Sequence, residues 1–232
     1  MTTAILLVLT MIVGRHGTSP VLLSENFNPT GYQLTWTETI SGGTLDEDSV
    51  AGAPGTGFAT QWLLIDRGGT AGTGTAKAVT AIRTTPVAYA RAYYDLRAYG
   101  TCPEVGGGSS YVDLFAMLDA SSNDLARLRV RYTCFEGEGL TYIDLYLGGV
   151  LTASYDVTAQ STGRVELSLS NSADTYALRI DGVSVASGSS AVSADIAQFQ
   201  LGGSVNASTS LRRIYAYQDA VVVRSDTWPG SV

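Results

Sequence analysis

DTYALRIDGVSVASG, residues 174–188, contains two short alternating runs on either side of Asp181-Gly182. An Asp-Gly pair supplies the two positive-φ positions of a type I′ turn, whose twist suits two antiparallel strands. The stretch therefore predicts a β-hairpin with one buried face and one wet face, as in an antiparallel sandwich, because strand side chains alternate. The predicted buried face pairs Ile180 with Val183 and Leu178 with Val185, and the wet face holds Arg179, Ser184 and Ala186.

The composition favours many strands and turns around a sizeable core. The chain has 232 residues, of which 45% are hydrophobic, 15% are charged and 26 are glycine. That length suits one large all-β domain or two small ones. The net charge of −7 and the absence of a basic cluster argue against nucleic-acid binding, which needs clustered Lys and Arg to neutralise phosphates.

Other strands are predicted along the chain at the short, regular spacing that is typical of a sandwich or barrel. The Gly/Thr-rich residues 67–77 are predicted to be a loop, and a short turn of helix is considered at 192–197. No linker or change of composition divides residues 21–232, which predicts one domain. The predicted strands, besides the hairpin, cover 32–40, 58–66, 78–84, 87–99, 111–120, 125–135, 140–157, 164–170, 196–203 and 211–225.

Two of these predicted strands contain a further pattern, a Gly-Gly turn in one and alternating arginines in the other. Gly148-Gly149 predicts a second two-residue turn, which would pair Leu147 with Val150. In residues 125–135 three successive alternate positions are arginines, so one face of the strand is basic there and the other is apolar. The basic face holds Arg127, Arg129 and Arg131, and the other holds Leu128, Val130 and Tyr132.

Residues 4–13, AILLVLTMIV, form an uninterrupted apolar run that is too short for a transmembrane helix of about 20 residues. Three interpretations stay open: a signal sequence, an assembly contact that docks on a neighbouring chain, or a strand of the domain's own core. We accordingly separate residues 1–20 as an apolar docking segment or signal sequence. The expected assembly contact consists of Ile5, Leu6, Leu7, Val8, Leu9, Ile12 and Val13.

The two cysteines, Cys102 and Cys134, are candidates for a disulfide between neighbouring strands. Closing a loop of that length would stabilise the fold by roughly 3–4 kcal/mol in the chain-entropy model. The alternative is two separate buried thiols. A disulfide would imply that the chain matures outside a reducing cytosol.

The C-terminal half carries a resemblance to a known superfamily. YALRIDGV (176–183) is followed by FQLGG (199–203), a strand that ends in glycine, and by IYAYQDAVVV (214–223), which has a central Asp before a Val run. With SENFNPTGYQLTWTET (24–39), the chain resembles the concanavalin A-like, laminin-G-like jelly-roll superfamily over roughly 20–225. The resemblance implies an all-β fold, an antiparallel two-sheet jelly-roll sandwich. It implies little about function, because this fold hosts lectins, glycosidases, adhesion modules and virion components.

Catalytic signatures are missing from the sequence. His16 is the only histidine, so two histidines cannot share a zinc site, and no Gly-x-Ser-x-Gly elbow occurs. Glycosidases need two carboxylates across the sugar, and the Glu-x-Asp-x-x-Glu strand used by enzymes of the related fold is absent. The nearest acidic groups, at 46–48 and 136–138, are predicted to be solvated turns. We therefore expect no enzymatic activity.

The resemblance also implies a structural Ca²⁺ ion between an acidic residue near the first strand and an Asp on the last. By position these are Glu25 and Asp219, with backbone carbonyls completing the ligand set. In the alternative interpretation, Asp219 bonds backbone N–H groups or an arginine such as Arg212 or Arg213.

A sugar-binding surface would use aromatic rings that stack on pyranose faces. The candidates are Trp62, Tyr89, Tyr93 and Tyr111. The alternative is that these rings belong to core and cross-strand packing.

These observations favour a non-enzymatic structural or adhesion module on a virion surface, such as a phage minor tail or decoration-type protein, because jelly-roll domains recur in such proteins. Its partners would be other virion or assembly proteins, reached through residues 1–20, and a weakly bound cell-surface glycan. A homo-oligomer is left open. The alternatives are a secreted, extracellular carbohydrate-binding lectin domain and, third, a glycoside hydrolase.

Overall fold

The computed structural model describes residues 19–25, 36–48, 62–66, 71–99, 102, 108–160, 162–208 and 213–229. Every regular element within these ranges is a β-strand, so none of them contains a helix that could span a membrane. The helical turn considered at 192–197 is wrong, because Ile196 already opens a strand. The expected assembly contact from Ile5 to Val13 lies outside the described residues.

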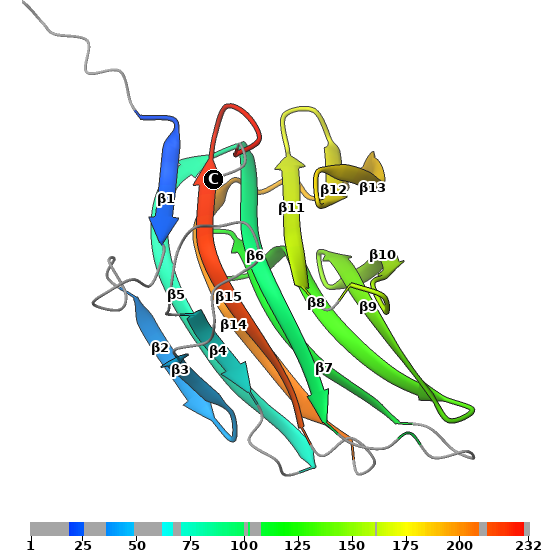
Figure 1. Cartoon of the computed structure of the whole chain (residues 1–232). Helices are drawn as coiled ribbons and strands as arrows, with labels where there is room; N and C mark the ends of the chain where they lie inside the picture. The colour runs from blue at the N-terminus through cyan, green and yellow to red at the C-terminus, as the bar shows by residue number, and fades with distance from the viewer. Residues whose placement is uncertain are drawn as a thin grey trace, which may run out of the picture.

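The first of two sheets has eight strands, all paired antiparallel (Figure 1). Its strands are β1 (Val21–Glu25), β3 (Thr44–Asp48), β4 (Trp62–Asp66), β6 (Val87–Tyr99), β11 (Thr162–Ser170), β12 (Thr175–Ile180), β13 (Val183–Ser189) and β15 (Arg213–Arg224). They lie in the order β13-β12-β11-β6-β15-β4-β3, and β1 also pairs with β15. The long strands β6 and β15 form the centre of this sheet.

The second sheet has seven strands and is also antiparallel throughout. Its strands are β2 (Thr37–Ser41), β5 (Gly72–Thr85), β7 (Ser109–Leu118), β8 (Asp124–Phe135), β9 (Glu138–Leu147), β10 (Val150–Asp156) and β14 (Ile196–Ala207). Their order is β10-β9-β8-β7-β14-β5-β2. The two sheets pack face to face (Figure 1), which confirms the predicted all-β antiparallel sandwich.

The hairpin between β12 and β13 forms as predicted at its turn. Asp181 and Gly182 both have positive φ, 50° and 82°, and Ile180 pairs with Val183 across them. Glycine suits the second position because a side chain costs free energy at such a φ. Gly148-Gly149 forms the same kind of turn between β9 and β10.

The predicted burial of the second hairpin strand is wrong at Val183, whereas Val185 is partly buried against the core. Val183 is 65% exposed, whereas Ile180 and Leu178 are buried. The register shifts after Leu178, so that Leu178 pairs with Ala186 and Val185 becomes the extra residue of a bulge. β13 is the last described strand of its sheet, so it has a neighbouring strand on one side only among the described residues.

Two further sequence predictions need correction. The Gly/Thr-rich segment predicted as a loop contains the start of β5, at Gly72, because those residues pair with β14. The acidic residues 46–48, predicted as a turn, belong to β3 and pair with β4. In contrast, the acidic residues 136–138 are exposed and include the turn between β8 and β9, as predicted.

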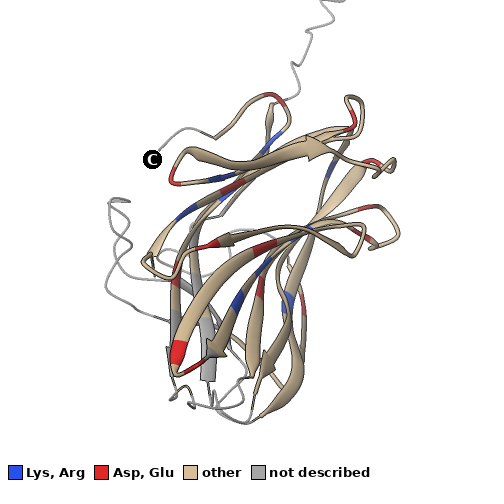
Figure 2. Cartoon of the chain, turned by 90° about the vertical axis from the view of Figure 1, so that its right-hand side faces the viewer, with Lys and Arg blue, Asp and Glu red and all other residues tan. Residues whose placement is uncertain are grey.

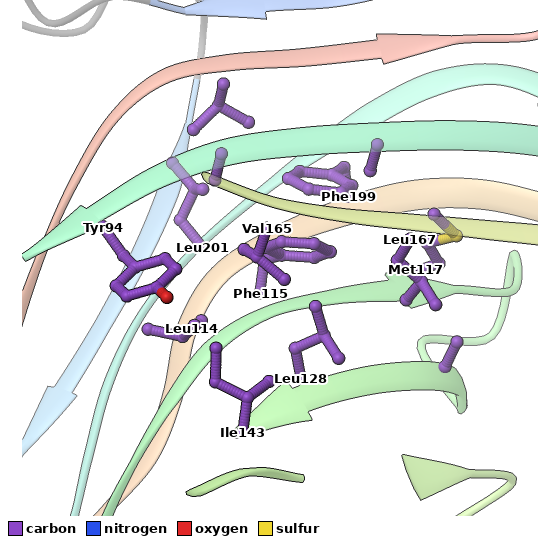
Figure 3. Packing of buried hydrophobic residues seen from close by; sticks show 14 of the residues in the cluster. Tyr94, Leu114, Phe115, Met117, Leu128, Ile143, Val165, Leu167, Phe199 and Leu201 are labelled. Carbon is purple, nitrogen blue, oxygen red and sulfur yellow. The ribbon is translucent and has the colours of Figure 1, made fainter. Parts of the chain in front are cut away.

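One apolar core lies between the sheets (Figure 3). Strand β6 contributes small side chains, since Ala88, Ala90 and Ala92 are fully buried. Strands β7 and β14 contribute large ones, and the rings of Phe115 and Phe199 lie 5.3 Å apart. Small side chains beside large ones let the two layers interdigitate without voids.

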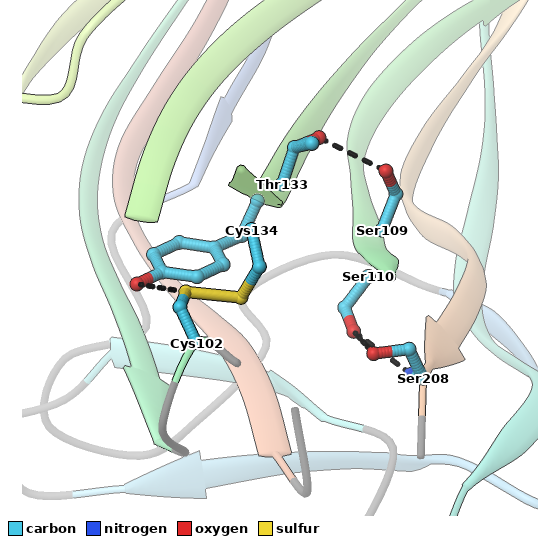
Figure 4. Close-up of a disulfide and its surroundings, with 7 residues drawn as sticks. Cys102, Ser109, Ser110, Thr133, Cys134 and Ser208 are labelled. Carbon is cyan, nitrogen blue, oxygen red and sulfur yellow. Dashed lines mark hydrogen bonds between the residues drawn. A yellow bond between two sulfur atoms is a disulfide. The ribbon is translucent and has the colours of Figure 1, made fainter. Parts of the chain in front are cut away.

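A disulfide joins Cys102 to Cys134 on β8, with a Cα–Cα distance of 5.1 Å (Figure 4). Next to it, Ser109 bonds Thr133 between β7 and β8 over 2.9 Å. The disulfide closes a separation of 32 residues, and it ties Cys102, between β6 and β7 in the chain, to the end of β8. In the chain-entropy model it contributes roughly 3–4 kcal/mol.

Tyr94 on β6 makes the folded state sensitive to alkaline pH. Its side chain is 1% exposed, and its hydroxyl has no hydrogen-bond partner in the described part of the chain. Burial, and then the charges of Asp181 and Tyr155, raise the pKa of Tyr94 far above its ordinary value. The folded state therefore holds the tyrosine proton more tightly than the unfolded state, which titrates near pH 10.

We predict that the free energy of unfolding falls as the pH rises above about 10, and that Tyr94→Phe removes part of this fall. At about pH 11 the expected difference in pH-induced loss between wild type and variant is about 1.4 kcal/mol. Urea unfolding at intervals between neutral pH and pH 11 measures it. An identical pH profile for both proteins would contradict the assignment to Tyr94.

Candidate functional site

The outer face of the seven-stranded sheet carries a cluster of arginine, aspartate and tyrosine side chains. On β8, Leu128 and Val130 belong to the core, so the arginines between them face outward, as the sequence predicted. Asp113 on β7 and Asp144 on β9 lie opposite Arg129 across the strand pairs. The cluster, which we call the Arg–Tyr face, consists of Tyr111, Asp113, Arg127, Arg129, Arg131, Tyr142, Asp144 and Tyr146.

Asp113 is a fully buried carboxylate held by two arginines. Its side chain is 0% exposed, and it accepts hydrogen bonds from Arg129 Nε at 2.6 Å and Arg127 Nη1 at 3.3 Å. It also accepts a bond from the backbone N–H of Ser204 at 2.8 Å. A buried charge is tolerated when it is paired and hydrogen-bonded in this way.

Strand β14 leaves room for this carboxylate. The register of β14 against β7 shifts between Leu201 and Val205, and Gly203 lies in the shifted segment. A Cβ atom at Gly203 would lie 2.6 Å from Asp113 Oδ2. Glycine is therefore required at this position by the close approach of the carboxylate to the backbone.

Asp144 forms the second buried pair. Its side chain is 0% exposed and accepts two hydrogen bonds from Arg131, at 2.7 Å from Nε and 3.2 Å from Nη2. Ser154 on β10 donates a third bond to it at 2.6 Å. The two-pronged bond fixes the plane of the guanidinium, and Thr133 holds its Nη1 at 2.9 Å.

Tyrosine rings flank the same arginines. The guanidinium of Arg129 lies 3.8 Å from the ring centre of Tyr111 and 5.1 Å from that of Tyr146. Arg131 lies 4.5 Å from the ring centre of Tyr142. These cation–π contacts restrict the arginines further, so the face presents a row of polar groups whose orientation is already determined.

The pKa values of two arginines reflect this pairing. Burial lowers the pKa of Arg129, but the hydrogen bond and charge of Asp113 outweigh it, and the pKa is raised. The hydrogen bond to Asp144 raises the pKa of Arg131 in the same way, against a smaller effect of burial. Both guanidiniums therefore remain charged at any physiological pH.

A shallow hollow of about 390 Å³ lies on the same outer face, over β2, β5 and β14. Its polar lining includes Lys77, Gln198 and Thr39. Gln200, two residues after Gln198 on β14, pairs with Ala116 of β7, which in turn pairs with Arg127. The hollow and the Arg–Tyr face are thus neighbouring parts of one outer surface.

The charges of the described residues are mixed rather than separated. Figure 2 shows basic and acidic residues interspersed along the strands of both sheets. A surface of this kind favours local recognition through individual contacts over long-range attraction of a highly charged partner.

The structure separates the four predicted sugar-stacking residues. Tyr111 lies on the Arg–Tyr face, but Tyr89 and Tyr93 lie on β6, in the other sheet. Tyr93 is only 9% exposed, and Tyr89 packs against Trp228 with ring centres 5.3 Å apart. Trp62 lies on β4, also in the eight-stranded sheet, and its side chain is outside the described set.

The backbone brings the two predicted calcium ligands onto neighbouring strands. Glu25 on β1 pairs with Val221 of β15, two residues beyond Asp219. The side chains of Glu25 and Asp219 are outside the described set. Among the side chains that the structure does describe, no group of three or more His, Cys, Asp or Glu is placed to hold a metal ion.

Sequence reasoning missed most of the Arg–Tyr face. It recognised the three outward arginines of β8 but not Asp113, Asp144, Tyr142 or Tyr146. The signal was present in YIDLYL (142–147), where polar and apolar residues alternate so that Tyr142, Asp144 and Tyr146 share one side.

No model of a known protein family matches the chain, and no curated protein matches it in sequence. Solved structures do match its fold. The binding domain of botulinum neurotoxin DC, in a complex with SialylT, has a TM-score of 0.55 at 6% identity; the match covers 90% of this chain and 48% of that chain. A protein described as a sialidase has a TM-score of 0.53 at 14% identity, over 90% of this chain and 19% of that chain.

The Bacillus licheniformis β-glucanase has a TM-score of 0.50 at 11% identity, over 89% of this chain and 98% of that chain. These structures are concanavalin A-like jelly-roll proteins, which confirms the jelly-roll sandwich that the sequence predicted. The chain spans about a fifth of the sialidase and about half of the toxin chain. At these identities the likeness concerns the fold alone.

We predict that Asp113→Asn destabilises the fold by about 3 kcal/mol, because it leaves the partly buried Arg129 without its counter-charge and removes one of the two carboxylates that pair with Arg127. The matched control is Asp124→Asn, whose carboxylate is 30% exposed and pairs with Arg127 at 3.2 Å. Its expected cost is below about 1 kcal/mol, as for other surface pairs. Urea unfolding of both variants tests this, and equal costs would show that the buried pair is not special.

Proposed function

We propose that the chain is a non-enzymatic carbohydrate-binding domain, and that the Arg–Tyr face with its adjacent hollow is the binding surface. The observation that carries the proposal is the fixed orientation of Arg129 between Tyr111 and Tyr146, with its Nε bonded to Asp113. In the described part of the chain, the two terminal nitrogens of Arg129 have no hydrogen-bond partner. They are available to donate to sugar hydroxyl or carboxylate oxygens.

Preorganised polar groups suit a sugar because each hydroxyl needs a directed partner, and ordering the side chains in advance reduces the entropy cost of binding. Aromatic edges and faces beside them suit the apolar C–H faces of a pyranose ring. The hollow lined by Lys77, Gln198 and Thr39 extends this surface beyond one ring. Solved structures that share the fold include a sialidase and a β-glucanase, whose names refer to carbohydrates, and this likeness supports a carbohydrate ligand.

The buried carboxylates favour binding over hydrolysis. Asp113 and Asp144 have no exposed side-chain surface, and arginines occupy their oxygens. A glycosidase needs one carboxyl group that protonates the leaving oxygen and another that attacks the sugar or activates water. Neither aspartate reaches solvent for these tasks. The absence of activity therefore stays part of the proposal, to be tested by reducing-sugar release.

We predict that a glycan array identifies a ligand, and that Tyr146→Ala weakens its binding about tenfold in titration calorimetry. Tyr89→Ala is the matched control, because that ring lies on the other sheet. Loss of binding in Tyr89→Ala with none in Tyr146→Ala would move the site to the eight-stranded sheet. An array without any selective ligand, or sugar release lost in Asp144→Asn, would reject the proposal itself.

A second proposal concerns the setting of the domain: a virion-surface module, docked through the apolar run 4–13, with cell-surface glycan as its ligand. The apolar run and the recurrence of jelly-roll domains in virion proteins favour it, and secretion is the alternative. A structural Ca²⁺ at Glu25 and Asp219 remains compatible with the pairing of their strands. Calorimetric titration of Ca²⁺ into the chelator-treated chain tests that site.

We predict that deleting residues 2–18 leaves a folded sandwich but abolishes co-sedimentation with phage particles from the producing host. The deletion stops before Pro20, whose carbonyl oxygen accepts a bond from the Ser225 N–H at 2.9 Å. The unfolding free energy should remain unchanged because β1 starts at Val21. Docking is excluded if the truncated chain still sediments with particles, or if the full chain never does.

A further inference from the structure

The outer face of the eight-stranded sheet holds a second group of arginines, which is separate from the Arg–Tyr face. On β6, Ala90 and Ala92 point into the core, so Arg91 faces outward. Arg91 pairs across the strands with Glu166 of β11, and Glu166 pairs in turn with Arg179 of β12. Arg164, two residues before Glu166, lies on the same face. We call Arg91, Arg164, Glu166 and Arg179 the Arg91 cluster.

The Arg91 cluster contains three positive charges and one negative charge. The side chain of Glu166 is 4% exposed, and its carboxylate pairs with Arg164, whose Nε lies 3.7 Å from Oε2. That distance is an ion pair but not a hydrogen bond. Within the described residues, neither Arg91 nor Arg179 has a carboxylate within 4.0 Å. Among the described residues, two positive charges of the cluster therefore have no carboxylate within ion-pair distance.

Arg91 is the unusual member of the cluster. It is only 4% exposed, and its Nε is buried with no hydrogen-bond partner among the residues that the structure describes. The Nε of Arg164 is unpartnered in the same sense. Buried guanidinium groups are normally paired, because removing them from water without a partner costs several kcal/mol. The Arg91 guanidinium lies 5.6 Å from the ring centre of Tyr93.

The pKa shifts of the arginines on the two outer faces differ in direction, in keeping with their different pairing. Burial lowers the pKa of Arg91; the charge of Arg164 lowers it further, and the opposing effects of Tyr93 and Glu166 do not compensate. On the Arg–Tyr face, by contrast, the paired arginines have raised pKa values. The three arginines of the Arg91 cluster thus share one carboxylate, that of Glu166, whereas Asp113 and Asp144 both lie among the arginines of the Arg–Tyr face.

The C-terminal segment borders the cluster with an aromatic ring. Trp228 packs on Tyr89 and also lies against Arg179, whose guanidinium is 4.1 Å from the indole ring centre. The neighbouring Arg224 is already neutralised by Asp226, at 2.9 and 3.0 Å. Arg224 therefore does not add to the excess positive charge of the Arg91 cluster, and Trp228, beside Arg179, provides a fluorescent probe close to it.

We propose that the Arg91 cluster is a binding site for a tetrahedral oxyanion, a sulfate or phosphate group. Such a group presents several acceptor oxygens, which match the fork of N–H donors on each guanidinium, and its charge offsets the excess of two. The site lies on the opposite outer face from the proposed sugar-binding surface and does not depend on it.

The experiment titrates inorganic sulfate, and separately inorganic phosphate, into the full disulfide-bonded chain. Calorimetry and tryptophan fluorescence follow binding, with sodium chloride at matched ionic strength as the reference. Saturable binding of either anion is expected. Arg179→Gln should weaken it at least about tenfold, since one charge-assisted contact is lost. Arg83→Gln is the charge-matched control on β5 and should leave the affinity unchanged.

Arg91→Gln should abolish saturable binding. Because Arg91 is buried, this variant can fail to fold, and the Arg179→Gln variant then provides the test. The proposal is overturned if the wild type shows no saturable binding of either anion. It is equally overturned if Arg179→Gln binds as tightly as the wild type, or if Lys77→Gln, on the other sheet, is the variant that loses binding.

Discussion

The strict alternation of side chains along paired strands is the constraint on which every other feature of this molecule depends. Each strand gives one face to the shared interior, and this leaves two outer faces whose side chains are free to differ. On β6, for example, core alanines alternate with Tyr89, Arg91 and Tyr93. Both clusters of charged residues exist because the core needs only half of the side chains.

The two outer faces stabilise their partly buried arginines in different ways. On the seven-stranded sheet, Asp113 and Asp144 supply buried counter-charges, and tyrosine rings cover the guanidiniums. On the eight-stranded sheet, one carboxylate, Glu166, lies among three arginines. On the first face the chain itself supplies the counter-charges, whereas on the second the arginines outnumber the carboxylate three to one.

The sequence was sufficient to predict the fold class, most strands and the two-residue turns, because these follow from local periodicity and from Gly and Asp at positive φ. It was insufficient wherever a bulge changed the register, as at Val185, since no local signal marks an extra residue. It also missed the buried aspartates, because Asp113 is stabilised by arginines 14 and 16 residues away and by the backbone of Ser204. Such partners come together only through tertiary pairing.

The last described strands, β10 and β13, lie on the same side of the sandwich (Figure 1), and each carries a bulge beside exposed apolar residues such as Leu151 and Val183. A regular, flat rim of free N–H and C=O groups would invite another molecule to continue the sheet, whereas an added residue spoils the spacing that a newcomer would have to match. These bulges therefore disfavour the addition of a strand from another molecule to either edge. At a high local concentration of the protein, they would hinder edge-to-edge association into fibres.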